Sequence, residues 1–189
     1  MMPMFKRTCG DIKAAKRYDP AAPSALMIFL TYPGVIALRR HRIAHRLWKT
    51  GLKNLARFIS YRTRRKTGID IHPNARIGKC VFIDHGMGLV IGETAIIGDH
   101  TVLYHGVTLG ANTFEKVDRH PKIGSHCVIY ANATVIGPIE IGDNTVIGAN
   151  AVVVRSAPAD SLLVGNPAHR NASSKVNRNA ASKNKDPEA

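Results

Sequence analysis

Residues 123–153 read IGSHCVIYANATVIGPIEIGDNTVIGANAVV, and the aliphatic residue that opens this stretch returns every six residues to its end. Glycine often follows this first residue directly. The fifth residue of each hexad is small or aliphatic: Cys127, Ala133, Ile139, Thr145 and Ala151. This repeat is typical of a chain that winds three short strands into each coil of about 18 residues and stacks aliphatic side chains in columns. We therefore expect Cys127 to pack in the core rather than to act as a nucleophile.

The same six-residue period extends back to Ile71. The leading aliphatic residues are Ile71, Ile77, Ile83, Ile91, Ile97, Leu103, Leu109, Ile123, Ile129, Val135, Ile141, Ile147 and Val153. Two interruptions break the period, one of two residues near Leu89 and one of eight residues between Leu109 and Ile123. The pattern predicts a β-helix domain over residues 69–170, with residues 111–121 forming a loop that projects from the coils.

The segments on either side of the repeat have different patterns. Residues 1–68 predict an α-helical segment. After Tyr32-Pro33-Gly34, its apolar residues recur mostly at three- to five-residue steps with Arg and Lys between them, which predicts an amphipathic helix or pair of helices. Asp19-Pro20 and Tyr32-Pro33-Gly34 interrupt the segment. Residues 171–189 contain one Val as their only large apolar residue, so we expect a disordered basic tail.

Charge and cysteine content limit the classes of function. The net charge is +14, but 16 of the 27 Lys and Arg residues lie in residues 1–66 and only 5 in residues 67–154. No nucleic-acid-binding motif accompanies this charge, so nucleic acid is a distant third hypothesis. Three irregularly spaced cysteines indicate neither a disulfide framework nor a zinc site. Without a secretory h-region or an uninterrupted apolar run of about 20 residues, we expect a cytoplasmic protein with no membrane partner.

Three histidine motifs interrupt the apolar and glycine pattern of the repeat. They are Asp70-Ile71-His72-Pro73, Asp84-His85-Gly86 and Asp118-Arg119-His120-Pro121. A lone histidine is most often a structural residue, but three with acidic neighbours indicate chemistry. A repeat domain alone is compatible with an enzyme or with a non-catalytic scaffold.

Six segments together resemble the serine acetyltransferases, and the resemblance extends from Asp19 to about Arg170. The segments are TYPGVIALRRHRIAHRLW (31–48), GIDIHPNARIG (68–78), IDHGMGLVIGETA (83–95), HGVTLG (105–110), DRHPKIG (118–124) and VGNPA (164–168). The resemblance implies a left-handed parallel β-helix of hexapeptide repeats, although the general rule for parallel strands favours right-handed crossovers. It also implies transfer of acetyl from acetyl-CoA to L-serine, which gives O-acetylserine for cysteine biosynthesis.

The resemblance also implies a role for particular residues. His85 corresponds to the general base and Asp70 to its orienting carboxylate. Imidazole can take the proton of a serine hydroxyl as the hydroxyl attacks the thioester. Asp19 and Asp84 correspond to the acidic residues that receive the ammonium group of serine. Arg119 and His120 correspond to the residues that hold its carboxylate. A zwitterionic amino acid needs both kinds of charge. No metal is expected.

Acetyl-CoA is expected in a groove between subunits, and the positions that approach it closely are Gly110, Ala111 and Ala131. The family implies a homotrimer, and a hexamer remains open. Residues 111–116 read ANTFEK where the family carries a second Gly and a Thr-Gly-Lys run, which alters the expected loop. The last residue is Ala189 rather than the Ile that docks many members into O-acetylserine sulfhydrylase, so we expect no such complex.

Two other functions remain open from the sequence. One is an O-acetyltransferase of the same fold that acts on a sugar or polysaccharide. Such an enzyme would share His85 but would not need Asp19, Arg119 and His120 to hold an amino acid. The other is a catalytically silent β-helix scaffold.

Overall fold

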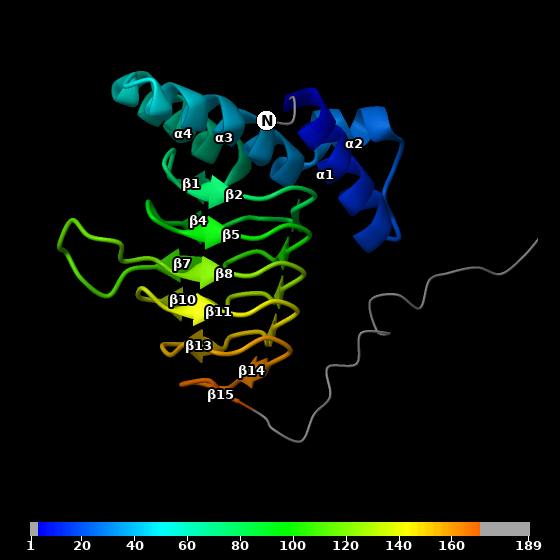
Figure 1. Cartoon of the computed structure of the whole chain (residues 1–189). Coiled ribbons are helices and arrows are strands. Elements are labelled where there is room, and N and C mark those ends of the chain that lie inside the picture. Colours follow the sequence, from blue (N-terminus) through cyan, green and yellow to red (C-terminus); the bar gives the residue numbers. More distant parts are fainter. Residues whose placement is uncertain (1–3, 171–189) are drawn as a thin grey trace, which may run out of the picture.

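The structure, a computed structural model, describes residues 4–170, so the tail predicted to be disordered lies outside the described residues. Four helices lie at one end of a stack of short strands (Figure 1). They are α1 (Met4–Tyr18), α2 (Ala25–Thr31), α3 (Pro33–Lys49) and α4 (Lys53–Thr67). The amphipathic pattern after Tyr32 thus forms two helices, α3 and α4.

The strands form three sheets that are the three sides of a prism. The first sheet contains β1 (Asp70–Ile71), β4 (Val90–Ile91), β7 (Thr108–Gly110), β10 (Thr134–Ile136) and β13 (Val152–Val153). The second contains β2 (Arg76–Ile77), β5 (Ile96–Ile97), β8 (Lys122–Ile123) and β11 (Glu140–Ile141). The third contains β3 (Phe82–Ile83), β6 (Val102–Leu103), β9 (Val128–Ile129), β12 (Val146–Ile147), β14 (Leu162–Val164) and β15 (His169–Arg170). All strand pairs are parallel except β14 with β15.

Both interruptions of the period fall at corners of the prism. The strands of the first sheet begin at residues 70, 90, 108, 134 and 152, so two of the four steps are 18 residues long. The step from β1 to β4 contains the two-residue interruption, in the turn at residues 84–89. The step from β7 to β10 contains the eight-residue interruption, in the projecting loop at residues 111–121 (Figure 1).

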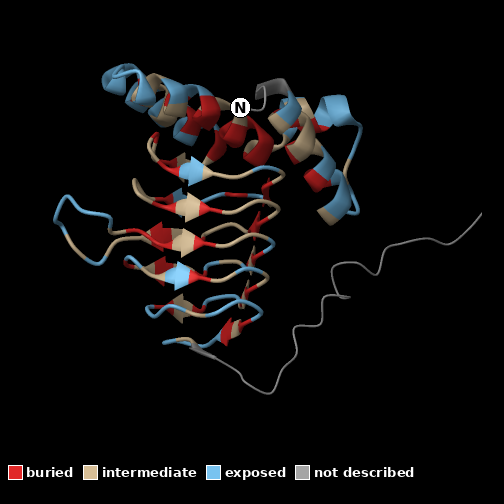
Figure 2. Cartoon of the chain, in the orientation of Figure 1, coloured by how far each residue is buried: buried red, intermediate tan, exposed pale blue. Residues whose placement is uncertain are grey.

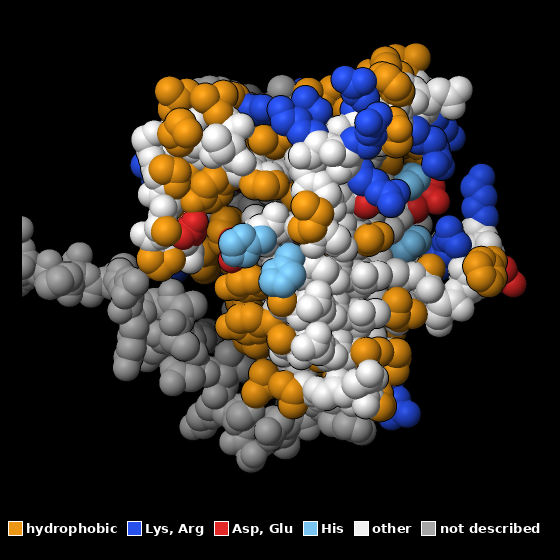
Figure 3. Space-filling model, turned by 180° about the vertical axis from the view of Figure 1, so that it is seen from behind, with side chains coloured by type: hydrophobic (Ala, Val, Ile, Leu, Met, Phe, Trp, Pro, Cys, Tyr) orange, Lys and Arg blue, Asp and Glu red, His pale blue; other side chains and the backbone are white. Residues whose placement is uncertain are grey.

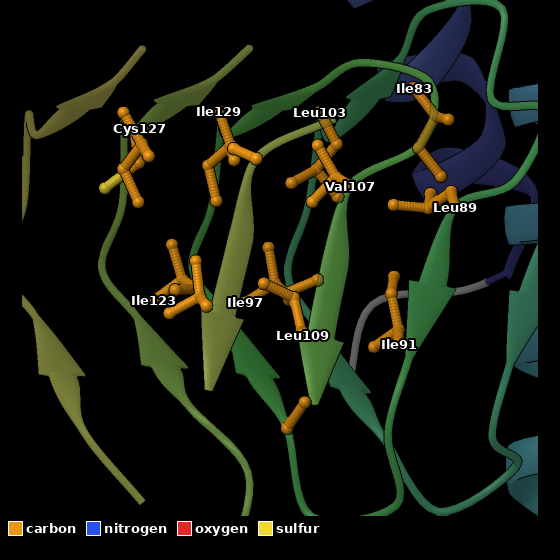
Figure 4. Packing of buried hydrophobic residues seen from close by; sticks show 14 of the residues in the cluster. Ile83, Leu89, Ile91, Ile97, Leu103, Val107, Leu109, Ile123, Cys127 and Ile129 are labelled. Carbon is orange, nitrogen blue, oxygen red and sulfur yellow. The ribbon is translucent and has the colours of Figure 1, made fainter. Parts of the chain in front are cut away.

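The core consists of the aliphatic columns that the period predicted. Ile83, Leu103 and Ile129 stack inside the prism, as do Ile91 and Leu109 (Figure 4). Figure 2 shows the buried residues along the inside of the coils, with the projecting loop exposed. Cys127 is fully buried in this core, and burial raises the pKa of its thiol to about 11. Its prediction as a core residue is confirmed.

The outward faces of the sheets differ in character, because alternate residues of a strand point to opposite faces. The second sheet presents mostly charged residues outward: Arg76, Ile96, Lys122 and Glu140. In the third sheet, the parallel strands β3, β6, β9, β12 and β14 present apolar residues outward: Phe82, Val102, Val128, Val146 and Leu162. Phe82 and Val102 are covered by Ile28 and Val35 of the helical segment. Val128, Val146 and Leu162, farther from the helices, form a partly buried aliphatic strip on this face.

The helical segment packs on the β-helix through α3 and is held together by a buried ion pair. Ala37 and Leu38 of α3 join the core of the β-helix. The Arg42 guanidinium lies 2.6 Å from the buried Asp11 carboxylate, which ties α3 to α1. Burial nevertheless raises the pKa of Asp11, because desolvation outweighs the attraction of Arg42. None of the described helices has the length and apolar character needed to cross a membrane.

Candidate active site

His85 lies in the enlarged turn between β3 and β4. This turn spans residues 84–89, two residues more than the equivalent turn at 104–107 in the next coil. His85 has a positive φ of 57°, a left-handed conformation that is uncommon for a residue with a side chain. Its side chain is 76% exposed, and its Nε2 lies 3.8 Å from Oδ1 of Asp84. The turn therefore holds an imidazole away from the prism with a carboxylate beside it.

Tyr32 hydrogen-bonds to one candidate carboxylate, Asp19, and its pKa is also raised by the charge of another, Asp84. Tyr32, between α2 and α3, donates a hydrogen bond from its hydroxyl to Oδ2 of Asp19 at 2.5 Å. Burial raises the pKa of Tyr32 to about 12, with further contributions from the charges of Asp19 and Asp84. One carboxylate thus binds this phenol directly, and the other acts on it through its charge. We call this group, with His85, the His85 corner.

A second histidine lies next to His85 on the following coil. The ring centroids of His85 and His105 are 6.1 Å apart, and the two rings are arranged edge to face. Nδ1 of His105 is buried without a hydrogen-bond partner in the described part of the chain. His105 therefore extends the His85 corner along the edge of the prism.

Three further candidate residues, Asp70, Arg119 and His120, line a cavity beneath α4. Its volume is about 460 Å³, and its polar lining includes Asp70, His72, Glu93, Arg119 and His120 together with Arg57 and Arg64 of α4. We call it the Arg119 cavity. Arg119 and His120 reach it from the end of the projecting loop, and the loop is secured by a hydrogen bond from Nη1 of Arg119 to the Thr113 carbonyl at 2.9 Å.

Thr94, in the corner between β4 and β5, holds His120 in place. Its hydroxyl oxygen accepts hydrogen bonds from the backbone N–H groups of Arg119 and His120, each at 3.1 Å. Its own N–H donates to Nδ1 of His120 at 3.2 Å. Because Nδ1 is an acceptor, the neutral ring carries its proton on Nε2 and can donate from there. Burial, followed by the charge of Arg119, lowers the pKa of His120 and favours this neutral form.

Gly92 makes room for that ring. A Cβ at this position would lie 1.9 Å from Cδ2 of His120, a distance that real Cβ atoms essentially never show. The glycine after the leading Ile91 thus belongs to the site as well as to the repeat. The sequence analysis did not identify Thr94 or Tyr32 as site residues, although both lie inside the quoted motifs.

The candidate residues form two groups in one copy of the chain. Asp70 makes its ion pair with Arg64 at 3.2 Å, whereas the acidic group nearest His85 among the described ion pairs is Asp84. Figure 3 shows histidines at two places on one face, near its middle and at its side beneath a group of Lys and Arg residues. The structure therefore places Asp84 beside His85, with Asp19 bound to Tyr32, and separately groups Asp70, Arg119 and His120 around one cavity.

The candidate cosubstrate residues are divided in the same way. Gly110 ends β7 and Ala111 begins the projecting loop, on the side of the Arg119 cavity. Ala131 lies in the turn between β9 and β10, one coil beyond His105, whose carbonyl accepts a hydrogen bond from Asn132. It thus belongs to the edge that carries His85. No group of three or more His, Cys, Asp or Glu side chains suited to a metal ion occurs among the described residues.

Comparisons with known proteins agree on one family. Residues 120–155 match the family described as bacterial transferase hexapeptide (six repeats). The chain is 53% identical to the serine acetyltransferase of Mycobacterium tuberculosis over 158 residues, which cover 84% of this chain and 69% of that protein. It is also 50% identical to the serine acetyltransferase of Staphylococcus epidermidis, covering 88% of this chain and 78% of that protein.

Solved structures give the same result. The Neisseria gonorrhoeae serine acetyltransferase in complex with serine matches with a TM-score of 0.86 and 43% identity, over 89% of this chain and 69% of that one. The Brucella abortus serine acetyltransferase in complex with coenzyme A matches with a TM-score of 0.85 and 38% identity, over 88% of this chain and 66% of that one. The fold class, a left-handed parallel β-helix with a helical N-terminal segment, is confirmed. By its coils, its histidine motifs and these similarities, the chain belongs to the serine acetyltransferase family.

Proposed function

We propose that this serine acetyltransferase moves the acetyl group of acetyl-CoA to the hydroxyl of L-serine in a site that two copies of the chain complete. The single observation that carries the proposal is the division of the candidate residues. One copy presents a base with two carboxylates at the His85 corner, and a cation with a hydrogen-bond donor in the Arg119 cavity. The two complexes described above contain serine and coenzyme A, which supports these substrates.

The outward faces of the prism support contact between copies. A strip of Val128, Val146 and Leu162 on the third sheet adjoins the edge that carries His85. A lone prism would expose this strip to water, at a cost that grows with its apolar area. The charged outer face of the second sheet suits solvent instead. We propose that the edge of one copy packs against the cavity side of the next, which closes a homotrimer around a threefold axis.

In such an assembly, His85 acts as the general base. Its neutral imidazole takes the proton of the serine hydroxyl while the oxygen attacks the thioester carbonyl carbon. The tetrahedral intermediate then collapses, the carbon–sulfur bond breaks, and the imidazolium returns the proton to the departing thiolate of CoA. In the isolated chain His85 is largely exposed, so the second copy also serves to exclude water. Asp70, which lines the Arg119 cavity of that copy, would approach and orient the ring.

The charges of the two halves match those of a zwitterionic amino acid. Asp19 and Asp84 offer negative charge for the serine ammonium. Arg119 offers a guanidinium for the carboxylate, and His120 an Nε2 donor held by Thr94. A sugar acceptor would not require this arrangement. The product, O-acetylserine, is the activated serine used for cysteine synthesis.

We propose that acetyl-CoA lies in the groove between copies. Gly110 and Ala111 of one copy and Ala131 of the next would form its walls, because small residues let the pantetheine approach the backbone. The residues that differ from the family, 111–116, belong to the projecting loop after β7 and would lie at the mouth of this groove.

The proposal is tested first by His85→Ala. We expect kcat to fall by at least about 100-fold, as for loss of a general base. The matched control is His100→Ala, since His100 also has a positive φ, 59°, at a different corner of the prism. It should retain near-normal activity, and equal losses in both variants would refute the role of His85. Turnover should be followed by thioester absorbance, because Cys9 and Cys80 are partly exposed to thiol reagents.

The acceptor is tested with a panel of L-serine, serine analogues and sugars at fixed acetyl-CoA. We expect turnover with L-serine and none with sugars. Acetylation of a sugar in preference to serine would overturn the proposed acceptor and leave the fold and the base in place.

A further inference from the structure

Asp19 differs from the other candidate residues because it lies outside the β-helix. It follows α1, in the short segment before α2, whereas Asp84 and His85 belong to the first coil. A carboxylate on such a connecting segment needs a support if it is to face Asp84 in a defined geometry. The structure contains one.

Both oxygens of Asp19 are held by uncharged donors. Oδ1 accepts the backbone N–H of Ala21 at 2.8 Å, and Oδ2 accepts the Tyr32 hydroxyl at 2.5 Å. Within the described part of the chain, no Lys, Arg or His forms an ion pair with Asp19. Its negative charge is therefore oriented but not neutralised.

Tyr32 is fixed by its place in the fold. It is the residue shared by the end of α2 and the start of α3. Its ring packs against the buried cluster that contains Ile28, Val35 and Phe82. Two residues later, Gly34 presses α3 onto the end of β3, where an added Cβ would lie 2.4 Å from the Ile83 carbonyl oxygen. Ile83 immediately precedes Asp84, so the same junction sets the position of Tyr32 relative to Asp84.

We propose that Tyr32 is a positioning residue for the acceptor: its hydroxyl holds the Asp19 carboxylate opposite Asp84, so that the two carboxylates together receive the ammonium group of serine. This inference rests on the proposed function, which gives Asp19 and Asp84 their ligand. It adds a residue that acts through Asp19 and without which Asp19 would be free to turn away.

The chemistry of a phenol suits this task. With a pKa of about 12, Tyr32 remains protonated and donates its hydrogen bond throughout the neutral range. A basic residue in its place would orient Asp19 equally well but would cancel the charge that the ammonium needs. A hydrogen bond to a charged group is also stronger than one between neutral groups.

The test is Tyr32→Phe in the full-length chain, with serine varied at saturating acetyl-CoA. Loss of one hydrogen bond to a charged group predicts a rise of about tenfold in the KM for serine. The KM for acetyl-CoA should stay unchanged, because the cosubstrate does not use Asp19. Tyr18→Phe is the matched control: Tyr18 packs on Phe82 in the same cluster, and its hydroxyl has no hydrogen-bond partner among the described residues.

Asp19→Asn and the double variant separate this role from a structural one. If Tyr32 acts through Asp19, the double variant should have the same KM for serine as Asp19→Asn alone. Additive losses, or a raised KM for both substrates, would show that Tyr32 merely supports the fold and would overturn the inference.

The same variants distinguish the inference from the proposed function. A raised KM for serine in Asp19→Asn with a KM within about twofold of wild type in Tyr32→Phe would reject the inference alone. An unchanged KM in Asp19→Asn would reject the proposed role of Asp19, and the inference with it.

Discussion

At the scale of single residues, His41 is the most unusual titratable group outside the proposed site. It is a buried residue of α3, and its Nδ1 has no hydrogen-bond partner in the described part of the chain. Burial lowers its pKa to about 3, and the nearby charges of His45, Arg42 and His72 add to the effect, while a backbone hydrogen bond involving Ala75 opposes it. His41 is therefore neutral in the folded chain at neutral and mildly acidic pH.

This predicts a loss of stability in mild acid. The folded pKa lies below the unfolded value of 6.5, so between these values the unfolded chain binds a proton that the folded chain does not. The contribution of His41 to stability is complete above pH 6.5 and falls with decreasing pH, by at most about 1.4 kcal/mol per pH unit. His41→Gln should flatten the dependence of the free energy of unfolding between pH 7.5 and 5.5, measured with urea. An unchanged slope, equal to that of the exposed control His126→Gln, would contradict this prediction.

At the scale of elements, the projecting loop depends on the corner between β4 and β5. The loop itself is the largest departure from the repeat, and Phe114 at its tip is fully exposed. Its end is nevertheless well anchored, because Thr94 binds the backbone of both Arg119 and His120. Lys122 adds a hydrogen bond to the Thr94 carbonyl at 2.8 Å. A small polar residue of one coil thus sets the geometry of a loop in the next.

Thr94→Val tests this anchoring, since valine keeps the shape of threonine but removes the hydroxyl. Two backbone N–H groups lose their acceptor, and we expect the KM for serine to rise by about tenfold while the protein remains folded. Thr145→Val removes a hydroxyl that bonds the Pro158 carbonyl in a later coil, and should leave this KM unchanged. Steady-state kinetics measures the KM of each variant, and circular dichroism checks that each variant is folded. Equal KM values in the two variants would exclude Thr94 from the site.

At the scale of the whole molecule, the proposed site is a property of the assembly. One copy carries both halves, but on different parts of the prism. Each site would therefore combine the His85 corner of one copy with the Arg119 cavity of the next, where Arg119 and His120 bind the serine carboxylate. This arrangement can be tested without knowing the details of the interface.

Mixing two inactive variants should restore activity. His85→Ala keeps the Arg119 cavity, and Arg119→Ala keeps the His85 corner. If subunits are dissociated, mixed in equal amounts and reassembled, about one quarter of the sites should contain an intact corner and an intact cavity. Recovery near this fraction, with none for either variant alone, supports shared sites. No recovery in oligomers shown by mass spectrometry to be mixed would mean that each chain forms its own site.

The coils could be predicted from the amino-acid sequence, because the six-residue spacing of aliphatic residues dictates which side chains point inward. The sequence also located the enlarged His85 turn and the projecting loop, because the interruptions near Leu89 and after Leu109 fall where they lie. The motifs that resemble the family named His85, Arg119 and His120.

The grouping of these residues became visible in the three-dimensional fold. Asp70 and His85 are less than one coil apart in sequence, yet Asp70 lines the cavity and pairs with Arg64, while His85 lies at a corner beside Asp84. The roles of Tyr32 and Thr94 also appeared only there, because each depends on a contact with a distant residue. The physical reason is that a repeat specifies whether a side chain points in or out, whereas the packing of helices and loops on the three-sided prism determines which outward side chains meet.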